Sequence, residues 1–181
     1  KGKKALRATE VKWREKAIEL YKQVANDYPN YPGRDQVLFY LGYSLWDIEK
    51  FKEALTIYKK MIQDYPKSQY IPDAYLAFGE YYFEQAKLEK ALIAYKKAAE
   101  YKESEIYPYA VYKQGWCYFN LHEWDKAKEQ FEAVIMLADM EAATTGRKIE
   151  IRKEALNDYT LTYSHKGSAK AAPRVFKRLA P

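Results

Sequence analysis

One pattern of residues occurs three times in this chain and constrains its fold more than any other feature. The first copy contains Gly42, followed by Ala54 and Tyr58. The glycine returns 37 residues later as Gly79 and a further 36 residues later as Gly115, and the alanine and aromatic positions return at the same intervals. A period of this size is typical of helical repeat proteins. We therefore predict an all-α fold, a right-handed superhelical solenoid of antiparallel helix pairs.

Apolar residues recur at three- and four-residue steps, and proline-containing turns separate the segments, so each segment is expected to be a helix. The expected pairs are 34–47 with 51–64, 72–86 with 88–101, and 108–121 with 124–138. We predict a single domain, 1–181, with three full repeats between a partial and a divergent one. Its parts are a half repeat over 1–33, repeats over 34–70, 71–106 and 107–138, a linker over 139–148 and a divergent repeat over 149–181.

Small residues indicate where the two helices of a pair should cross. Gly79 is expected to lie against Ala91, with equivalent crossings in the other copies, because helices approach closely only where side chains are small. Trp46 and Trp116 are expected to be partly exposed. The larger repeat positions are expected to fill the core, namely Phe51, Leu88, Trp124, Tyr58, Tyr95 and Phe131.

The residues Leu41-Gly42, Ala54, Tyr58 and Pro66 resemble the tetratricopeptide repeat, whose pattern is W-x2-L-G-x2-Y...A-x3-F...P. The likeness covers most of residues 10–137. Within that family, the segment Asp64–Ala74 is similar to linkers of BamD-like outer-membrane lipoproteins and of CpoB-like periplasmic proteins of the Tol-Pal system. Residues 155–178 are similar to repeats of gliding-motility envelope lipoproteins. The resemblance implies a scaffold in a bacterial envelope complex, in the periplasm or at the outer membrane.

In arrays of this kind the first helix of each pair lines the concave side, where positions around the repeat glycine should face a groove. Most of these positions hold aromatic residues. The candidate partner-binding residues are Phe39, Tyr40, Tyr43, Trp46, Leu76, Glu80, Phe83, Tyr109, Tyr112, Trp116, Phe119 and Tyr163. Chaperone-tail receptors of the resembled family clamp a carboxylate with lysine, asparagine and arginine, which these positions lack. The groove instead suits an apolar, aromatic or proline-containing protein segment, bound as an extended peptide or as a helix. Another part of the full-length protein or a second copy is the alternative occupant.

The formal net charge of +6 is concentrated at the two ends of the chain. Residues 1–22 carry eight basic and three acidic side chains, and residues 147–181 carry nine and three. A nucleic-acid binder more typically has a basic stripe along its binding face. Nucleic acid is therefore not an expected partner, and a cytoplasmic adaptor or nucleic-acid-associated repeat protein is the alternative function.

Catalysis has little support in the residue pattern. Cys117 is the only cysteine, and His122 and His165 lie 43 residues apart. The sequence has no paired histidines at helical spacing, no nucleophile elbow and no glycine-rich phosphate loop. We expect no enzyme activity, no cofactor and no metal site. Any membrane association is expected to come from a lipid anchor outside this sequence or from partner proteins.

Overall fold

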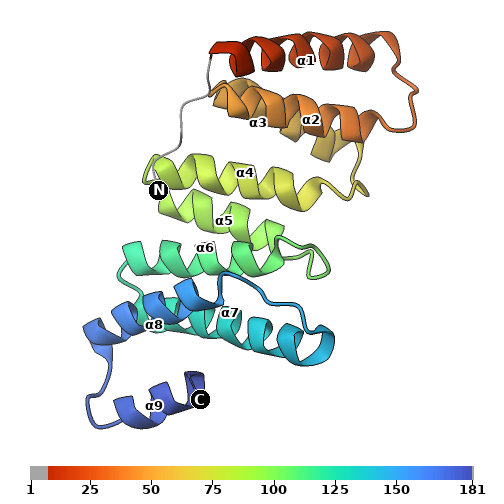
Figure 1. The fold of residues 1–181 in the computed structure, drawn as a ribbon. Helices are drawn as coiled ribbons and strands as arrows, with labels where there is room; N and C mark the ends of the chain where they lie inside the picture. Colours follow the sequence, from red (N-terminus) through yellow and green to blue (C-terminus); the bar gives the residue numbers. More distant parts are fainter. Residues whose placement is uncertain (1–7, 181) are drawn as a thin grey trace. The chain divides into compact units, whose positions relative to one another are not determined.

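The structure is a computed structural model, and it describes residues 8–180. The chain divides into two compact units, residues 1–77 and residues 78–181, and the helix α4 (Ile71–Glu84) spans the boundary. Every regular element among the described residues is a helix (Figure 1), which confirms the all-α prediction. The single domain and the superhelical handedness stay predictions.

The first unit contains α1 (Ala8–Asp27), α2 (Arg34–Asp47), α3 (Phe51–Asp64) and the first half of α4. The bounds predicted for the first full pair, 34–47 and 51–64, are confirmed. Polar side chains hold the connections in place. The Arg34 guanidinium donates to the carbonyl oxygen of Ala25 at 3.1 Å, and the Ser68 hydroxyl donates to the Asp35 carboxylate at 2.7 Å.

The second unit contains the remainder of α4 and five further helices. These are α5 (Leu88–Ala98), α6 (Tyr107–Asn120), α7 (Trp124–Thr145), α8 (Arg152–Lys166) and α9 (Ala172–Leu179). Pro108 and Pro173 each lie in the first turn of their helices, where the missing N–H has no intrahelical partner to lose. The divergent repeat forms two helices, α8 and α9, as the sequence predicted, and the rings of Tyr163 and Phe176 bring them into contact.

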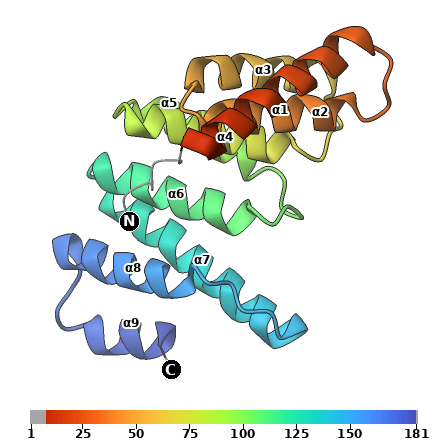
Figure 2. The ribbon, with the colours of Figure 1, turned by 45° about the horizontal axis from the view of Figure 1, so that its top comes forward.

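Helix α7 is longer than the repeat pattern predicts. Residues 139–145, which were expected to belong to a linker, continue the helix as far as Thr145 (Figure 2). The segment contains Met140, Glu141 and two alanines, which are favourable helix residues. Gly146 then ends the helix in the left-handed region, with φ of 74°, and its amide donates to the carbonyl of Ala142. The linker predicted over 139–148 is wrong in its first seven residues.

In each of the three regular helix pairs the repeat glycine lies directly against an aromatic ring of the second helix. A Cβ atom built on Gly79 would lie 2.3 Å from the ring of Tyr95. Ala91, one helical turn before Tyr95 on the same helix, is fully buried, and its predicted crossing with Gly79 stays a prediction. The equivalent contacts, Gly42 with Tyr58 and Gly115 with Phe131, are similarly close, at 2.5 and 2.6 Å. Each glycine provides the space that a buried ring occupies.

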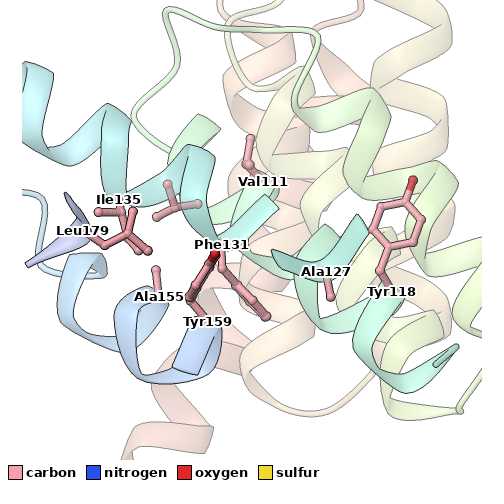
Figure 3. Close-up of a cluster of buried hydrophobic side chains, with 9 residues drawn as sticks. Val111, Tyr118, Ala127, Phe131, Ile135, Ala155, Tyr159 and Leu179 are labelled. Atoms are coloured by element: carbon pink, nitrogen blue, oxygen red, sulfur yellow. The ribbon is translucent and has the colours of Figure 1, made fainter. Parts of the chain in front are cut away.

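A buried cluster joins the helices of the second unit from α6 to α9 (Figure 3). Phe131 and Ile135 of α7 lie between residues of the neighbouring helices, among them Val111, Tyr159 and Leu179. Burial of large apolar side chains of this kind contributes roughly 1.5–3 kcal/mol per residue. The divergent last pair is thus held to α7 by the same type of core as the regular repeats.

Candidate functional site

Helix α2 presents a row of aromatic side chains in the first unit. Tyr40 is 39% exposed and Tyr43 is 45% exposed, whereas Phe39 is half-buried. Phe39 stacks on Tyr70 with ring centroids 4.5 Å apart and contacts the edge of Tyr40 at 5.3 Å. The half-buried stack fixes the position of the row, and the two exposed tyrosine rings leave apolar surface and hydroxyl groups open to a ligand.

Helix α1 covers part of this row. Tyr21 stacks against Tyr40 at 6.3 Å, and the Arg14 guanidinium lies 5.5 Å from the centre of the Tyr43 ring. Arg14 also forms an ion pair with Asp47 at 2.6 Å. An internal cation therefore already neutralises the carboxylate at the end of α2.

Two further predicted groove residues of the first unit, Trp46 and Leu76, are half-buried. Trp46 packs its ring against the edge of Phe51, with centroids 4.8 Å apart. Phe51, Leu88 and Trp124, the first residues of their helices, are also half-buried, so the prediction that they belong to the core is wrong. Each lies where a second helix begins, at the periphery of its pair.

The second unit contains a lysine enclosed by aromatic rings and a carboxylate. The Lys113 ammonium lies 3.1 Å from both oxygens of Glu80. Its distances to the ring centres of Phe83, Tyr95 and Tyr109 are 4.4, 5.7 and 5.9 Å. The Tyr95 hydroxyl donates to Glu80 at 2.8 Å. We call these five residues the Lys113 cage.

Burial and the Glu80 charge act together on the groups around the Lys113 cage. Burial raises the pKa of Tyr95, and the neighbouring Glu80 carboxylate raises it further. The same two causes raise the pKa of Tyr109 to about 12. Burial likewise raises the pKa of the Cys117 thiol to about 12, which keeps it protonated near neutral pH. Glu80, one of the predicted groove residues, is therefore engaged inside the protein.

Tyr112 and Trp116 of α6 face Asp158 of α8. The Tyr112 hydroxyl donates to the Asp158 carboxylate at 2.6 Å. Burial raises the pKa of Asp158, and hydrogen bonds from Tyr112 and Trp116 act in the opposite direction. Trp116 is half-buried, as predicted, and packs edge-on against Phe119. The polar ends of both predicted binding residues are therefore satisfied within the protein.

The remaining predicted residues, Phe119 and Tyr163, pack near the C-terminus of α8. Phe119 contacts the edge of Trp124 at 5.1 Å, and the exposed His165 imidazole stacks on Trp124 at 4.3 Å. Tyr163 contacts Phe176 of α9 at 5.3 Å, and its hydroxyl donates to the carbonyl of Ser168. These contacts anchor the last helix pair. Among the predicted residues, ring contacts join Phe39 with Tyr40, Tyr109 with Tyr112, and Trp116 with Phe119, while one groove formed by all twelve stays a prediction.

Sequence reasoning missed Lys113, Asp158 and a cavity in the second unit. The sequence did contain a sign of Lys113. It is the charged residue of α6, and it lies one helical turn from the predicted groove residue Trp116. The cavity has a volume of about 780 Å³ and lies between the α5–α6 loop, the end of α7 and the segment that follows it. Its lining includes Tyr107, Met140 and Ile149. Part of its lining, Met140, Glu141 and Thr144, comes from the extension of α7 beyond its predicted end.

Within residues 8–180, no helix is long and apolar enough to cross a membrane. The same described residues contain no group of three or more histidine, cysteine or acidic side chains arranged to hold a metal ion.

The sequence matches the tetratricopeptide repeat over residues 36–68 and 109–135, and a second description of the same repeat matches residues 72–105. Together these segments cover more than half of the chain. No curated protein sequence matches the chain significantly.

Solved structures of repeat proteins resemble the fold over nearly its whole length. MamA is 27% identical, with a TM-score of 0.67, and the match covers 96% of this chain and 93% of MamA. A tetratricopeptide repeat protein from Parabacteroides merdae is 21% identical, with a TM-score of 0.64 over 92% of this chain and 59% of its own. A putative kinesin light chain from Podosopora anserina is 13% identical, with a TM-score of 0.64 over 94% and 84%.

Proposed function

The chain belongs to the tetratricopeptide-repeat family, and from that premise we propose that it is a non-enzymatic scaffold binding a segment of another protein. Tetratricopeptide repeats generally mediate protein–protein interaction, and proteins built from them are typically not enzymes. The segment is apolar, aromatic or contains proline, and it binds as an extended peptide or a helix along the first helices of the pairs.

The observation that carries this proposal is the exposure of Tyr40 and Tyr43 on α2. Both rings lie beside a fixed aromatic stack, so a ligand would meet a surface that does not need to rearrange. Large aromatic residues at the centre of an interface often cost about 2 kcal/mol or more when truncated. The predicted groove rings Tyr112 and Trp116 of α6 instead have their hydroxyl and indole groups bound to Asp158, which makes α2 the better candidate surface.

Site-specific photocrosslinking in the native cell tests the proposal. A photoreactive residue in place of Tyr43 should capture a protein partner, and a Tyr40→Ala change in the same chain should reduce the yield at least about fivefold. The matched control places the photoreactive residue at Ile93, which is 63% exposed on α5, a second helix. Equal capture from both positions, or no specific capture at position 43, would contradict binding at α2.

We place the scaffold in a bacterial envelope complex for outer-membrane assembly, for a Tol-Pal-like system or for gliding motility. The support is the likeness of the segment Asp64–Ala74 to linkers of envelope proteins. Fractionation of the native cell, followed by immunoblotting for this chain, tests the location. Recovery in the periplasmic or outer-membrane fraction is expected, and recovery with cytoplasmic markers would favour the cytoplasmic adaptor instead.

Ion pairs of the second unit argue against a nucleic-acid function. Among the basic residues near the C-terminus, Arg178 pairs with Glu132 of α7 and Arg152 pairs with Asp139. These cations are thus partly neutralised within the protein. Binding to single-stranded RNA or duplex DNA is expected to stay in the non-specific range of roughly 10⁻⁴ to 10⁻⁶ M at physiological salt. Sub-micromolar, sequence-selective binding in a filter assay would reverse this ranking.

A further inference from the structure

The Lys113 cage shows how this repeat holds a cation. Its parts come from fixed repeat positions: Glu80 follows one repeat glycine, and Lys113 lies two residues before the next. The rings of Phe83 and Tyr95 complete it together with Tyr109. A carboxylate with aromatic faces stabilises an ammonium group by ion pairing and by cation–π attraction, which strengthens as the cation loses water.

The preceding repeat has the same positions, all of them in the first unit. Trp46 corresponds to Phe83, Tyr58 to Tyr95, and Tyr43 to Glu80. The position of the lysine holds Ala77, whose side chain carries no charge. The first unit thus retains aromatic residues at three cage positions and has no lysine at the fourth. The Arg14 guanidinium, which lies 5.5 Å from the Tyr43 ring, comes from α1 and is paired with Asp47.

In the first unit, a carboxylate occupies the remaining position of the cage, the one that corresponds to Tyr109. Asp73, which corresponds to Tyr109, lies four residues before Ala77 and therefore on the same face of α4. Its charge acts on the buried Tyr58 hydroxyl, because after burial it is the largest cause that raises the pKa of Tyr58. Asp47, the next cause, is already paired with Arg14. Among the described residues, no cation pairs with Asp73.

We propose that the first unit binds a lysine or arginine side chain of the partner segment, with Asp73 as its counterion and the accessible rings of Tyr43 and Trp46 as its aromatic surroundings. The proposal rests on the function proposed above, because it names the chemistry that the α2 surface selects. The segment recognised is accordingly one in which a basic residue accompanies apolar, aromatic or proline residues. Charge complementarity favours this occupant over a neutral or acidic segment.

Selection from random peptides tests the proposal without a known partner. Peptides displayed on phage are selected on the full chain, and the recovered sequences are synthesised and titrated by fluorescence anisotropy. We expect a shared lysine or arginine, whose replacement by norleucine weakens binding at least about tenfold. High salt should weaken the parent peptide more than the norleucine peptide, because screening acts on the ion pair.

Variants at two positions of the protein test whether Asp73 is the charge that binds the peptide. Asp73→Asn should weaken the basic peptides at least about tenfold, and Asp73→Glu should recover part of the loss. Ala77→Lys places an internal cation beside the site and should weaken them similarly. The matched control is Asp64→Asn, which removes an exposed carboxylate of α3 that pairs with Lys60, and it should leave the affinity unchanged.

The outcomes separate this inference from the proposed function. Peptides that lose affinity on Tyr40→Ala but bind the Asp73→Asn variant as tightly as the parent protein would overturn the basic-residue proposal alone. Selected peptides without a shared basic residue would do the same. If no selected peptide responds to Tyr40→Ala or Tyr43→Ala, both the inference and the α2 binding surface are wrong.

Discussion

Tyr58 and Tyr95 occupy the same position in successive repeats, yet their surroundings differ in one decisive respect. Both rings are buried, at 3% and 0% exposed, and both press on the repeat glycine of the facing helix. The Tyr95 hydroxyl donates to Glu80, which is paired with Lys113. Tyr58 makes no such bond to a described residue, and the positions of that pair hold Tyr43 and Ala77.

The difference shows that a shared apolar framework can carry either a closed or an open polar site. In the second unit the cation and its carboxylate both belong to the protein, so the cage is internally satisfied. In the first unit a carboxylate and aromatic rings remain, and the rings at positions 40 and 43 are exposed. Substitutions at a few equivalent positions therefore close the polar site of the second unit, and under the proposal above they leave that of the first unit for a partner.

The largest expected effect comes from filling the space beneath the ring. Gly79→Val should lower the free energy of unfolding by about 1–3 kcal/mol, since the new side chain overlaps Tyr95. Gly42→Val should cost about 1 kcal/mol less, because the hydroxyl of Tyr58 is not held as that of Tyr95 is. Urea denaturation of both variants measures the difference, with the exposed Ala143→Val on α7 as the control for β-branching. Equal losses would show that the hydroxyl bond does not restrain the ring.

Removing the cation from the Lys113 cage tests how far the second unit depends on it. Lys113→Met should destabilise the protein by about 2 kcal/mol, because Glu80 keeps its charge in a half-buried place with only the Tyr95 hydroxyl as a partner and no cation. Adding Glu80→Gln should restore most of the loss. Lys60→Met, which breaks an exposed ion pair with Asp64, should change the stability by no more than about 0.5 kcal/mol. A similar small loss for Lys113→Met would mean that the cage contributes little.

Transferring the closed arrangement to the first unit tests the comparison directly. The double variant Tyr43→Glu with Ala77→Lys places the carboxylate and the cation of the cage at the equivalent positions. We expect the peptide affinity to fall at least about tenfold, which is about 1.4 kcal/mol, with stability changed by less than about 1 kcal/mol. Melting curves and anisotropy titrations measure the two quantities. Undiminished peptide binding by a folded double variant would contradict the assignment of the site to this position.

The smallest expected effect is the pH dependence of Asp73. Burial raises the pKa of this carboxyl in the folded protein above its unfolded value, so the stability it contributes is present below the unfolded pKa of about 3.9 and is lost as pH rises through the folded pKa. Asp73→Asn should therefore melt at the same temperature as the parent protein or slightly higher near neutral pH, with the curves converging in acid. A lower melting temperature near neutral pH would indicate that the ionised carboxylate stabilises the fold.

The repeat interval was sufficient to predict the helix pairs, because the glycine, alanine and aromatic positions each determine a local packing contact. The bounds of α2 and α3 agree with the prediction to the residue. The prediction failed where the pattern stopped: α7 continues to Thr145 because its later residues favour helix and Gly146 provides the end. The half-buried state of Trp124 was also missed, since its position beside His165 depends on a helix far along the chain.

The sequence by itself determined the family, the order of the helices and the aromatic character of their first members, because these follow from residue spacing within one repeat. Only the tertiary structure decided which of those side chains are engaged. The sequence predicted that Glu80 could bind a partner, but in the structure it is paired with Lys113, which lies 33 residues further along the chain. Tyr112 likewise binds Asp158, 46 residues away. Contacts between helices of different repeats decide which charged groups and hydroxyls are paired within the protein. The repeat period carries no information about these contacts.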